Sequence, residues 1–174
     1  MRHPQVLPPH AHTVVELGCG NGAFGAAFKR VQPACRYFGI DADRDSVRAA
    51  ARVLDRAAAE PYGSVDFSRY GLEQVDCILC RAPYWQSEGL PRLLATFREM
   101  LAPNGQIVLS MRLGYPVDTI APILGQFGSA VGFDMDDKRY IRIFCGTQMR
   151  TLGIRTLTYD PVCENIRVRL PNGF

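Results

Sequence analysis

Three glycines between a short β-rich run and a helical pattern constrain the fold of this chain more than any other feature. Gly18, Gly20 and Gly22 stand at alternate positions, after the run 13–17 and before a helical pattern at 23–31. Glycine lets the backbone turn sharply and lets a ligand approach backbone N–H groups. In open α/β folds, a turn from a strand into a helix lies at the carboxyl edge of the sheet, where such folds bind ligands. The sequence therefore predicts a ligand site at this turn.

Apolar runs alternate with helical patterns along the rest of the chain. Helices are expected after Asp43 with apolar positions up to Ala58, after Ser87, and around 119–127. The further strands are expected at 36–41, 64–68, 75–80 and 106–111. This alternation predicts a doubly wound, mostly parallel sheet with helices on both faces. Only residues 69–74 separate two of these strands, so a reduced helix or a loop is expected there.

Strand-like runs without helices between them end the pattern. Residues 129–135 and 139–145 have hairpin spacing, so the sheet is expected to end in an antiparallel β-hairpin. Residues 166–170 alternate apolar side chains with arginine and predict a strand that needs an edge to pair with. We expect one domain at 1–146 and an extension of one or two strands at 147–174. The last strand could pair within the chain, with a second copy or with a fused domain, since the chain could be cut from a longer polypeptide.

Composition indicates a globular protein. The chain has 174 residues, of which 47% are hydrophobic and 21% charged, and this excludes wholesale disorder. No apolar run is long enough to span a membrane and the N-terminus lacks the apolar run of a signal peptide, which predicts a cytoplasmic protein. The formal net charge of +3 is too weak to indicate a nucleic-acid partner.

The six cysteines do not indicate a disulfide framework or a metal site. Cys77 and Cys80 match the spacing of a zinc-binding pair, but they lie in an apolar strand-like run. Residues three apart in a strand point to opposite faces, so these two side chains cannot share one zinc ion. Buried thiols that pack as small apolar groups are expected instead.

The glycine turn alone fits two kinds of cofactor. Gly18, Gly20 and Ala23 also satisfy the dinucleotide fingerprint G-x-G-x-x-G/A. Asp41 follows Gly20 by 21 residues, at the end of the second predicted strand. A carboxylate there accepts hydrogen bonds from ribose hydroxyls. Asp41 therefore fits a dinucleotide and equally another cofactor that contains a ribose.

Two features besides the terminal hairpin argue against a dinucleotide. The first is an acid in the opening strand, which suits a ligand with a cationic amino-acid end. Glu16 stands two residues before Gly18, where a dinucleotide site normally has an apolar residue. Asp66 and Phe67 close the predicted third strand and offer an acid for an exocyclic amine and a ring for adenine. A turn-forming role for Asp66 is the alternative.

Four segments together resemble class I S-adenosylmethionine-dependent methyltransferases: 14–22, 39–42, 75–80 and 101–110. The resemblance covers approximately residues 13–146. It implies a Rossmann-like methyltransferase fold with a seven-stranded sheet whose last strand is antiparallel, in agreement with the hairpin. It also implies S-adenosylmethionine as the cofactor.

The resemblance assigns cofactor contacts by position. The glycine loop would hold the methionine part, and the acid before it would orient the loop and the bound amine. Asp41, which ends the second strand, would hold the ribose. Ala42, Asp66 and Phe67 would contact the base. Cys80, at the end of the fourth strand, would lie beside the sulfonium. These residues are Glu16, Gly18, Cys19, Gly20, Asn21, Gly22, Asp41, Ala42, Asp66, Phe67 and Cys80.

The expected catalytic residues are Arg81, Tyr84 and Asp118. Arg81 stands where amino-group methyltransferases of this family begin (Asp/Asn/Ser)-Pro-Pro-(Tyr/Phe/Trp). Arginine has no acceptor for a hydrogen bond from an amine, so Arg81 argues against N-methylation of nucleic-acid bases and favours an anionic substrate or the cofactor carboxylate. Tyr84 is placed to stack on a substrate, and Asp118 is a candidate base or a helix N-cap.

We therefore expect a small class I methyltransferase that acts on a small molecule, at oxygen, without a nucleic-acid or membrane partner. One alternative is a non-catalytic cofactor-binding module that serves a partner or a fused domain. Another is an NAD(P)-binding oxidoreductase domain, which shares the glycine loop but leaves Glu16 and the hairpin unexplained.

Overall fold

The structure of the chain is a computed structural model. It describes residues 7, 10–61, 65–80, 90–110, 130–133, 140–144, 157–160 and 165–168. The elements in chain order are β1 (Thr13–Leu17), α1 (Ala23–Val31), β2 (Arg36–Asp41), α2 (Arg44–Ala50), β3 (Arg56–Ala59), the 3-10 helix η3 (Phe67–Tyr70), β4 (Val75–Cys80), α3 (Leu90–Met100), β5 (Leu101–Ser110), β6 (Ala130–Phe133), β7 (Tyr140–Phe144), β8 (Leu157–Asp160) and β9 (Asn165–Val168).

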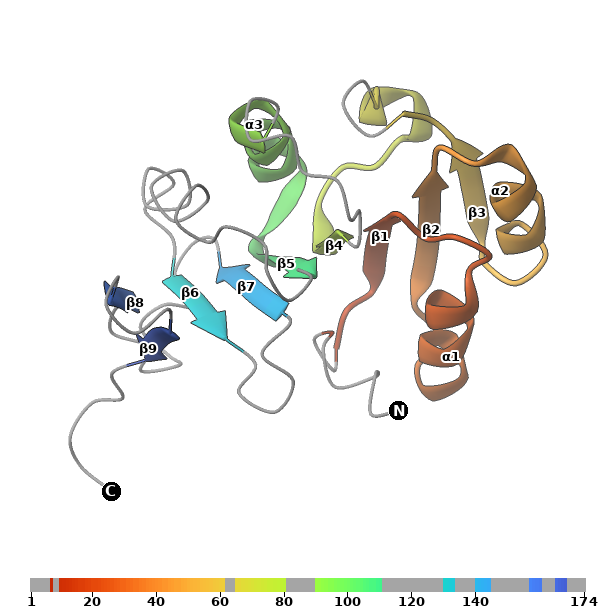
Figure 1. The fold of residues 1–174 in the computed structure, drawn as a ribbon. Coiled ribbons are helices and arrows are strands. Elements are labelled where there is room, and N and C mark those ends of the chain that lie inside the picture. Colours follow the sequence, from red (N-terminus) through yellow and green to blue (C-terminus); the bar gives the residue numbers. More distant parts are fainter. Residues whose placement is uncertain are drawn as a thin grey trace.

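A seven-stranded sheet forms the centre of the molecule (Figure 1). Its strand order is β3-β2-β1-β4-β5-β7-β6. Strands β1 to β5 pair in parallel, and β7 runs antiparallel to both β5 and β6. The predicted doubly wound sheet with a terminal antiparallel hairpin is confirmed.

Two buried clusters cover the two faces of the sheet. On one face, Phe24 and Phe28 of α1 and Leu54 beyond α2 pack with alternate residues of the strands. On the other face, Leu94 and Phe97 of α3 pack with the remaining ones. Since side chains of a strand alternate between faces, the nearly continuous apolar strands are explained by this double cover.

The predicted third strand at 64–68 is wrong. The strand beside β2 is β3, in which Arg56 pairs with Phe38 and Ala59 with Asp41. The predicted helix after Asp43 accordingly ends at Ala50 instead of continuing to Ala58. Pairing with the edge of β2 outweighs the weak strand preference of an alanine-rich run. The reduced helix expected before β4 is present as η3.

Strand β5 starts earlier than predicted. Residues 103–105 were expected to form a turn, but they lie within β5, where the register jumps from the pair Val75–Leu101 to the pair Cys77–Gln106. A Cβ atom at Gly105 would stand 2.9 Å from the carbonyl oxygen of Val75. The irregularity therefore requires a residue without a side chain at this point.

The C-terminal strand has a partner in the chain itself. β9 pairs with β8 in an antiparallel two-stranded sheet, with Leu157 opposite Val168 and Asp160 opposite Asn165. The division into domains at 146/147 stays a prediction, and the helix expected at 119–127 lies outside the described residues. Within the described part of the chain, no helix is both long and apolar enough to cross a membrane.

Candidate cofactor site

The glycine loop connects β1 to α1 at the carboxyl edge of the sheet. Gly18, Gly20 and Gly22 have φ angles of +78°, +53° and +78°, in the left-handed region that glycine adopts without strain. A Cβ atom at Gly20 would meet nothing within 4 Å, whereas one at Gly22 would stand 3.0 Å from the Cα atom of Ala50. The loop therefore packs against α2 at Gly22 and faces open space at Gly20.

Most backbone N–H groups of the loop are already used within the protein. The N–H groups of Gly18 and Cys19 donate to the carbonyl oxygen of Ile40, at 2.8 and 3.1 Å, and that of Gly22 donates to Cys19 at 3.0 Å. The expectation that these groups lie bare for a ligand is wrong for them. The glycines instead bring the loop close to β2 and leave free volume above Gly20.

Asp41 connects the glycine loop to the start of α2. Its Oδ2 accepts from the N–H of Gly20 at 2.8 Å, and its Oδ1 accepts from the N–H of Asp43 at 3.0 Å. Asp41 is half-buried. Each carboxylate oxygen has room for a second donor, so the geometry leaves Asp41 able to accept ribose hydroxyls in addition.

Glu16 lies beneath the loop and is completely buried. Its Oε2 accepts a hydrogen bond from the hydroxyl of Tyr37 at 2.9 Å, and both side chains are inaccessible to solvent. In this geometry Glu16 does not touch a ligand directly. A charge on Glu16 would be screened much less there than in water.

The thiol of Cys19 lies within reach of the charges of Glu16 and Asp41. Burial, followed by the charges of Glu16 and Asp41, raises the pKa of Cys19 to about 12. The side chain is accommodated because β2 has a glycine at this point: a Cβ atom at Gly39 would stand 2.8 Å from the Cys19 Sγ atom. The causes of this pKa shift indicate that both carboxylates lie close to the loop.

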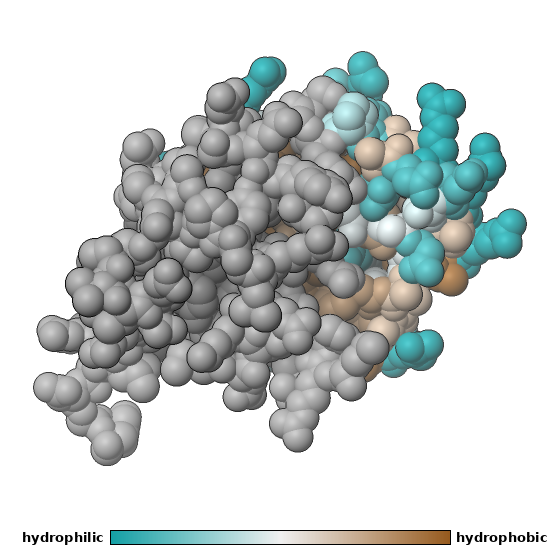
Figure 2. Space-filling view, in the orientation of Figure 1, coloured by the Kyte–Doolittle hydropathy of each residue, from teal (hydrophilic) through white to brown (hydrophobic). Residues whose placement is uncertain are grey.

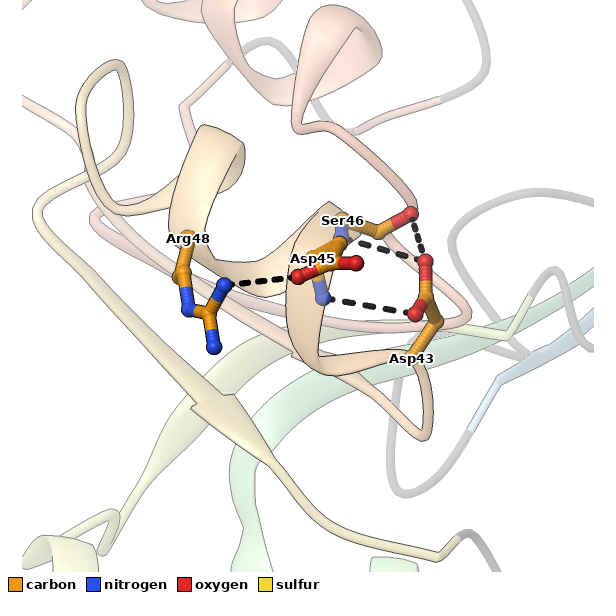
Figure 3. A network of polar contacts seen from close by, with 4 residues as sticks. All are labelled: Asp43, Asp45, Ser46 and Arg48. Atoms are coloured by element: carbon orange, nitrogen blue, oxygen red, sulfur yellow. Dashed lines mark hydrogen bonds and ion pairs between the residues drawn. The ribbon is translucent and has the colours of Figure 1, made fainter.

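Helix α2 starts immediately after Asp41 and Ala42. The side chain of Asp43 caps it by accepting from the N–H groups of Asp45 and Ser46, at 3.3 and 3.1 Å (Figure 3). A hydrogen bond from the Ser46 hydroxyl, followed by these two backbone bonds, lowers the pKa of Asp43. Ala42 is exposed beside the cap, and its place next to adenine stays a prediction. Figure 2 shows hydrophilic residues gathered on the side of the molecule where α2 and β3 lie in Figure 1.

Asp66 and Phe67 are engaged in local structure. Asp66 caps η3 by accepting from the N–H of Ser68 at 3.2 Å and forms an ion pair with Arg69 at 3.1 Å. Phe67 is 4% exposed and packs edge-on against Phe97, with 6.1 Å between ring centroids. The alternative of a turn-forming Asp66 therefore describes this geometry, and the contacts of both residues with the base stay predictions.

Cys80 ends β4 opposite Leu17, the last residue of β1. It is buried on the face of the sheet that α3 covers, whereas Cys77 belongs to the cluster on the other face, as the strand alternation predicted. The expected catalytic residues Arg81, Tyr84 and Asp118 lie outside the described residues.

Sequence reasoning missed Tyr37 and Gly39, the two residues of β2 that accommodate the acid and the thiol. Glu16 pairs in register with Gly39, and Tyr37 is diagonal to Glu16. The available signal was an aromatic residue and a glycine in the second strand. Their contacts with the first strand depend on the register of the two strands, which the sequence alone does not determine.

Comparison with known proteins places the chain in a family. A family model described as a methyltransferase domain matches residues 15–107, from β1 into β5. The chain belongs to this methyltransferase domain family. Membership confirms the resemblance to class I methyltransferases and S-adenosylmethionine as the cofactor, and it sets aside the NAD(P)-binding alternative.

Curated relatives are named ribosomal RNA large subunit methyltransferase G. The one from Shewanella loihica is 31% identical over 127 residues, which cover 62% of this chain and 31% of that protein. The one from Alcanivorax borkumensis is 31% identical over 122 residues, which cover 63% and 31%. The matched part of the chain thus spans about a third of the length of these relatives.

Solved methyltransferase structures share the fold. A TehB-like S-adenosylmethionine-dependent methyltransferase from Corynebacterium glutamicum has a TM-score of 0.65 at 15% identity, over 83% of this chain and 87% of that chain. A sugar N-methyltransferase from Streptoalloteichus has a TM-score of 0.64 at 13% identity, over 83% and 84%.

The expectation of a small-molecule substrate and no nucleic-acid partner is wrong, because the curated relatives are named for ribosomal RNA. That expectation relied partly on the net charge of +3. A net charge is a sum over the chain and does not report how charges are arranged on one surface. Its second basis, Arg81, lies outside the described residues.

Proposed function

We propose that this protein transfers a methyl group from S-adenosylmethionine to ribosomal RNA. The observation that supports it most is the match of the segment from β1 into β5 to the methyltransferase domain family, together with curated relatives named for large-subunit ribosomal RNA. Acceptance of the methyl group by an oxygen atom stays a prediction that depends on Arg81.

The residues present suit this cofactor. Gly20 faces open space next to the Asp41 carboxylate, and Glu16 contributes a second carboxylate beneath the loop. Two acids around one glycine turn favour a ligand that carries ribose hydroxyls and a cationic end over an anionic one.

In this proposal the protein contributes alignment and exclusion of water. Bound S-adenosylmethionine supplies an electrophilic methyl group on a sulfonium. Asp41 would hold the ribose while it keeps the loop tied to α2, and Glu16 would favour positive charge above the loop. Orientation of this kind lowers a displacement barrier by about 7–11 kcal/mol without a catalytic side chain.

The test is methyl transfer from labelled S-adenosylmethionine to three acceptors: large-subunit ribosomal RNA, small-subunit ribosomal RNA and an extract of small metabolites. Label in large-subunit RNA, and its loss in Asp41→Ala but not in Asp45→Ala, is the expected result. Asp45 is a suitable control because its carboxylate is exposed and forms an ion pair with Arg48. Label in metabolites alone would overturn the RNA proposal. Cofactor binding without transfer to any acceptor would identify a non-catalytic binding module instead.

A further inference from the structure

We infer that Tyr37 is a positioning residue for the amino-acid end of the cofactor, because its hydroxyl holds the Glu16 carboxylate beneath the glycine loop. The inference rests on the proposed function only in that the loop binds S-adenosylmethionine. It concerns a residue of β2 that the family resemblance does not assign to the site.

The ring of Tyr37 is held on several sides. A Cβ atom at Gly25 of α1 would stand 2.5 Å from the ring, so helix and ring are in direct contact. Phe28 packs against the ring at a tilt, with 6.1 Å between centroids. The backbone N–H of Tyr37 donates to Asp55 at 2.6 Å, and Asp55 forms an ion pair with Lys29. A ring fixed in this way places its hydroxyl at one point, and that point is 2.9 Å from Glu16 Oε2.

Glu16 lies close to the glycine loop as well as to Tyr37. It pairs in register with Gly39, the residue on which the Cys19 side chain lies. Its charge is the second largest cause of the raised pKa of Cys19, after burial. One carboxylate is therefore held by Tyr37 from below and acts on the loop above.

A buried carboxylate in a fixed position favours a positive charge at the nearest open point, since few solvent dipoles screen it. The loop offers open space at Gly20, the residue that follows Cys19. The amino-acid end of S-adenosylmethionine and of its product S-adenosylhomocysteine carries an ammonium group. 5′-Methylthioadenosine has the same nucleoside and thioether but lacks the amino-acid end. Comparing these two ligands therefore isolates the effect of Glu16 and Tyr37 from the rest of the site.

The test measures the Kd of both ligands by calorimetry for the wild type, Tyr37→Phe, Glu16→Gln and the double variant. Tyr37→Phe is expected to weaken S-adenosylhomocysteine by about tenfold or more, the size of a lost hydrogen bond to a charged group, and to leave methylthioadenosine within about twofold. Glu16→Gln is expected to weaken the same ligand selectively. In the Glu16→Gln background, Tyr37→Phe should add little, because the two residues act as a unit.

Tyr70 provides a matched control. Its hydroxyl donates to Glu60 Oε1 at 2.7 Å, so Tyr70→Phe removes the same kind of bond on the opposite face of the sheet. It is expected to leave both Kd values unchanged.

Other outcomes overturn the inference in distinguishable ways. Equal weakening of both ligands by Tyr37→Phe would show that Tyr37 only supports the loop, and no change would show that it does not act on the site. If Tyr37→Phe does not fold, the variant Glu16→Leu/Tyr37→Phe replaces the pair by apolar groups. Retention of the wild-type preference for S-adenosylhomocysteine in that variant would refute the inference. Binding of neither ligand by the wild type would instead refute the proposed function.

Discussion

Among single residues, Asp41 connects two parts of the candidate site. One carboxylate accepts from the N–H groups of Gly20 and Asp43 and so joins the glycine loop to the first turn of α2. If Asp41 also binds the ribose, cofactor binding stabilises both the glycine loop and the start of α2. Loss of its side chain therefore affects the shape of the loop as well as the contact with the sugar.

Replacement of Asp41 by alanine is expected to weaken binding of S-adenosylhomocysteine by about 1–3 kcal/mol through loss of charge-assisted hydrogen bonds. Isothermal titration calorimetry measures this directly. Asp45→Ala, which removes an exposed carboxylate in the first turn of the same helix, should leave the affinity unchanged. Equal affinities of the wild type and Asp41→Ala would exclude a role of Asp41 in the site.

The Cys19 thiol makes the stability of the protein depend on pH in the alkaline range. Its pKa is raised from 9.0 to about 12, so between these values the folded state retains a proton that the unfolded state releases. The corresponding stability is present below pH 9 and is lost as the pH rises toward 12. Cys35, whose pKa is raised to about 11, acts in the same direction.

We expect Cys19→Ala to lose less stability than the wild type when the pH is raised from about 8 to about 10. Urea unfolding at the two pH values measures the difference, and other titrating groups cancel in the comparison. Cys77→Ala, which removes a buried thiol of β4, serves as the control for cavity formation. Identical pH dependence of wild type and Cys19→Ala would contradict the raised pKa.

At the scale of elements, periodicity predicted most of the sheet. The bounds of β1, β2 and β4 agree with the apolar runs read from the sequence. The failures have a common physical cause. The run 56–59 carries little strand preference of its own, and the extra residues at 103–105 are accommodated only because β4 lies beside them. Pairing with a neighbouring strand determines the conformation of such segments, and local sequence patterns do not show that pairing.

The contact between α1 and β2 depends on Gly25. Alanine at this position would improve helix propensity by about 1 kcal/mol, but its Cβ atom would stand 2.5 Å from the Tyr37 ring and 2.6 Å from Leu54. Overpacking of a buried contact costs about 1–3 kcal/mol, so we expect Gly25→Ala to be destabilising. Chemical denaturation tests this against Ala26→Gly in the same helix, which loses propensity without a clash. A stabilised Gly25→Ala would show that propensity, and not packing, governs α1.

For the molecule as a whole, the meeting of the glycine turn with Glu16 and Asp41 at one edge of the sheet was predictable, and the bonds among them were not. The glycine turn, Glu16 and Asp41 were identified because the carboxyl ends of parallel strands meet at one edge of the sheet. The bond between Glu16 and Tyr37 and the occupied N–H groups of the loop depend on register and on distances of a few ångströms. Substrate class was mispredicted in part because it was inferred from net charge, which is not a property of the site, and its second basis, Arg81, lies outside the described residues.

The cofactor is expected to stabilise the entire fold, since the glycine loop contacts β2 and α2 as well as continuing into α1. S-adenosylhomocysteine at about 100 times its Kd adds about 2.7 kcal/mol to the free energy of unfolding. For a domain of this size, about 2–4 °C per kcal/mol predicts a rise in Tm of about 5–10 °C. NAD shares the adenosine part, including the ribose hydroxyls expected to bind Asp41, but would bring an anionic pyrophosphate to the glycine loop that lies close to the buried Glu16, so it should cause no comparable rise. A thermal melt with each ligand at equal concentration decides the matter. A rise with NAD and none with S-adenosylhomocysteine would mean that the two acids around the loop do not select for a cationic ligand.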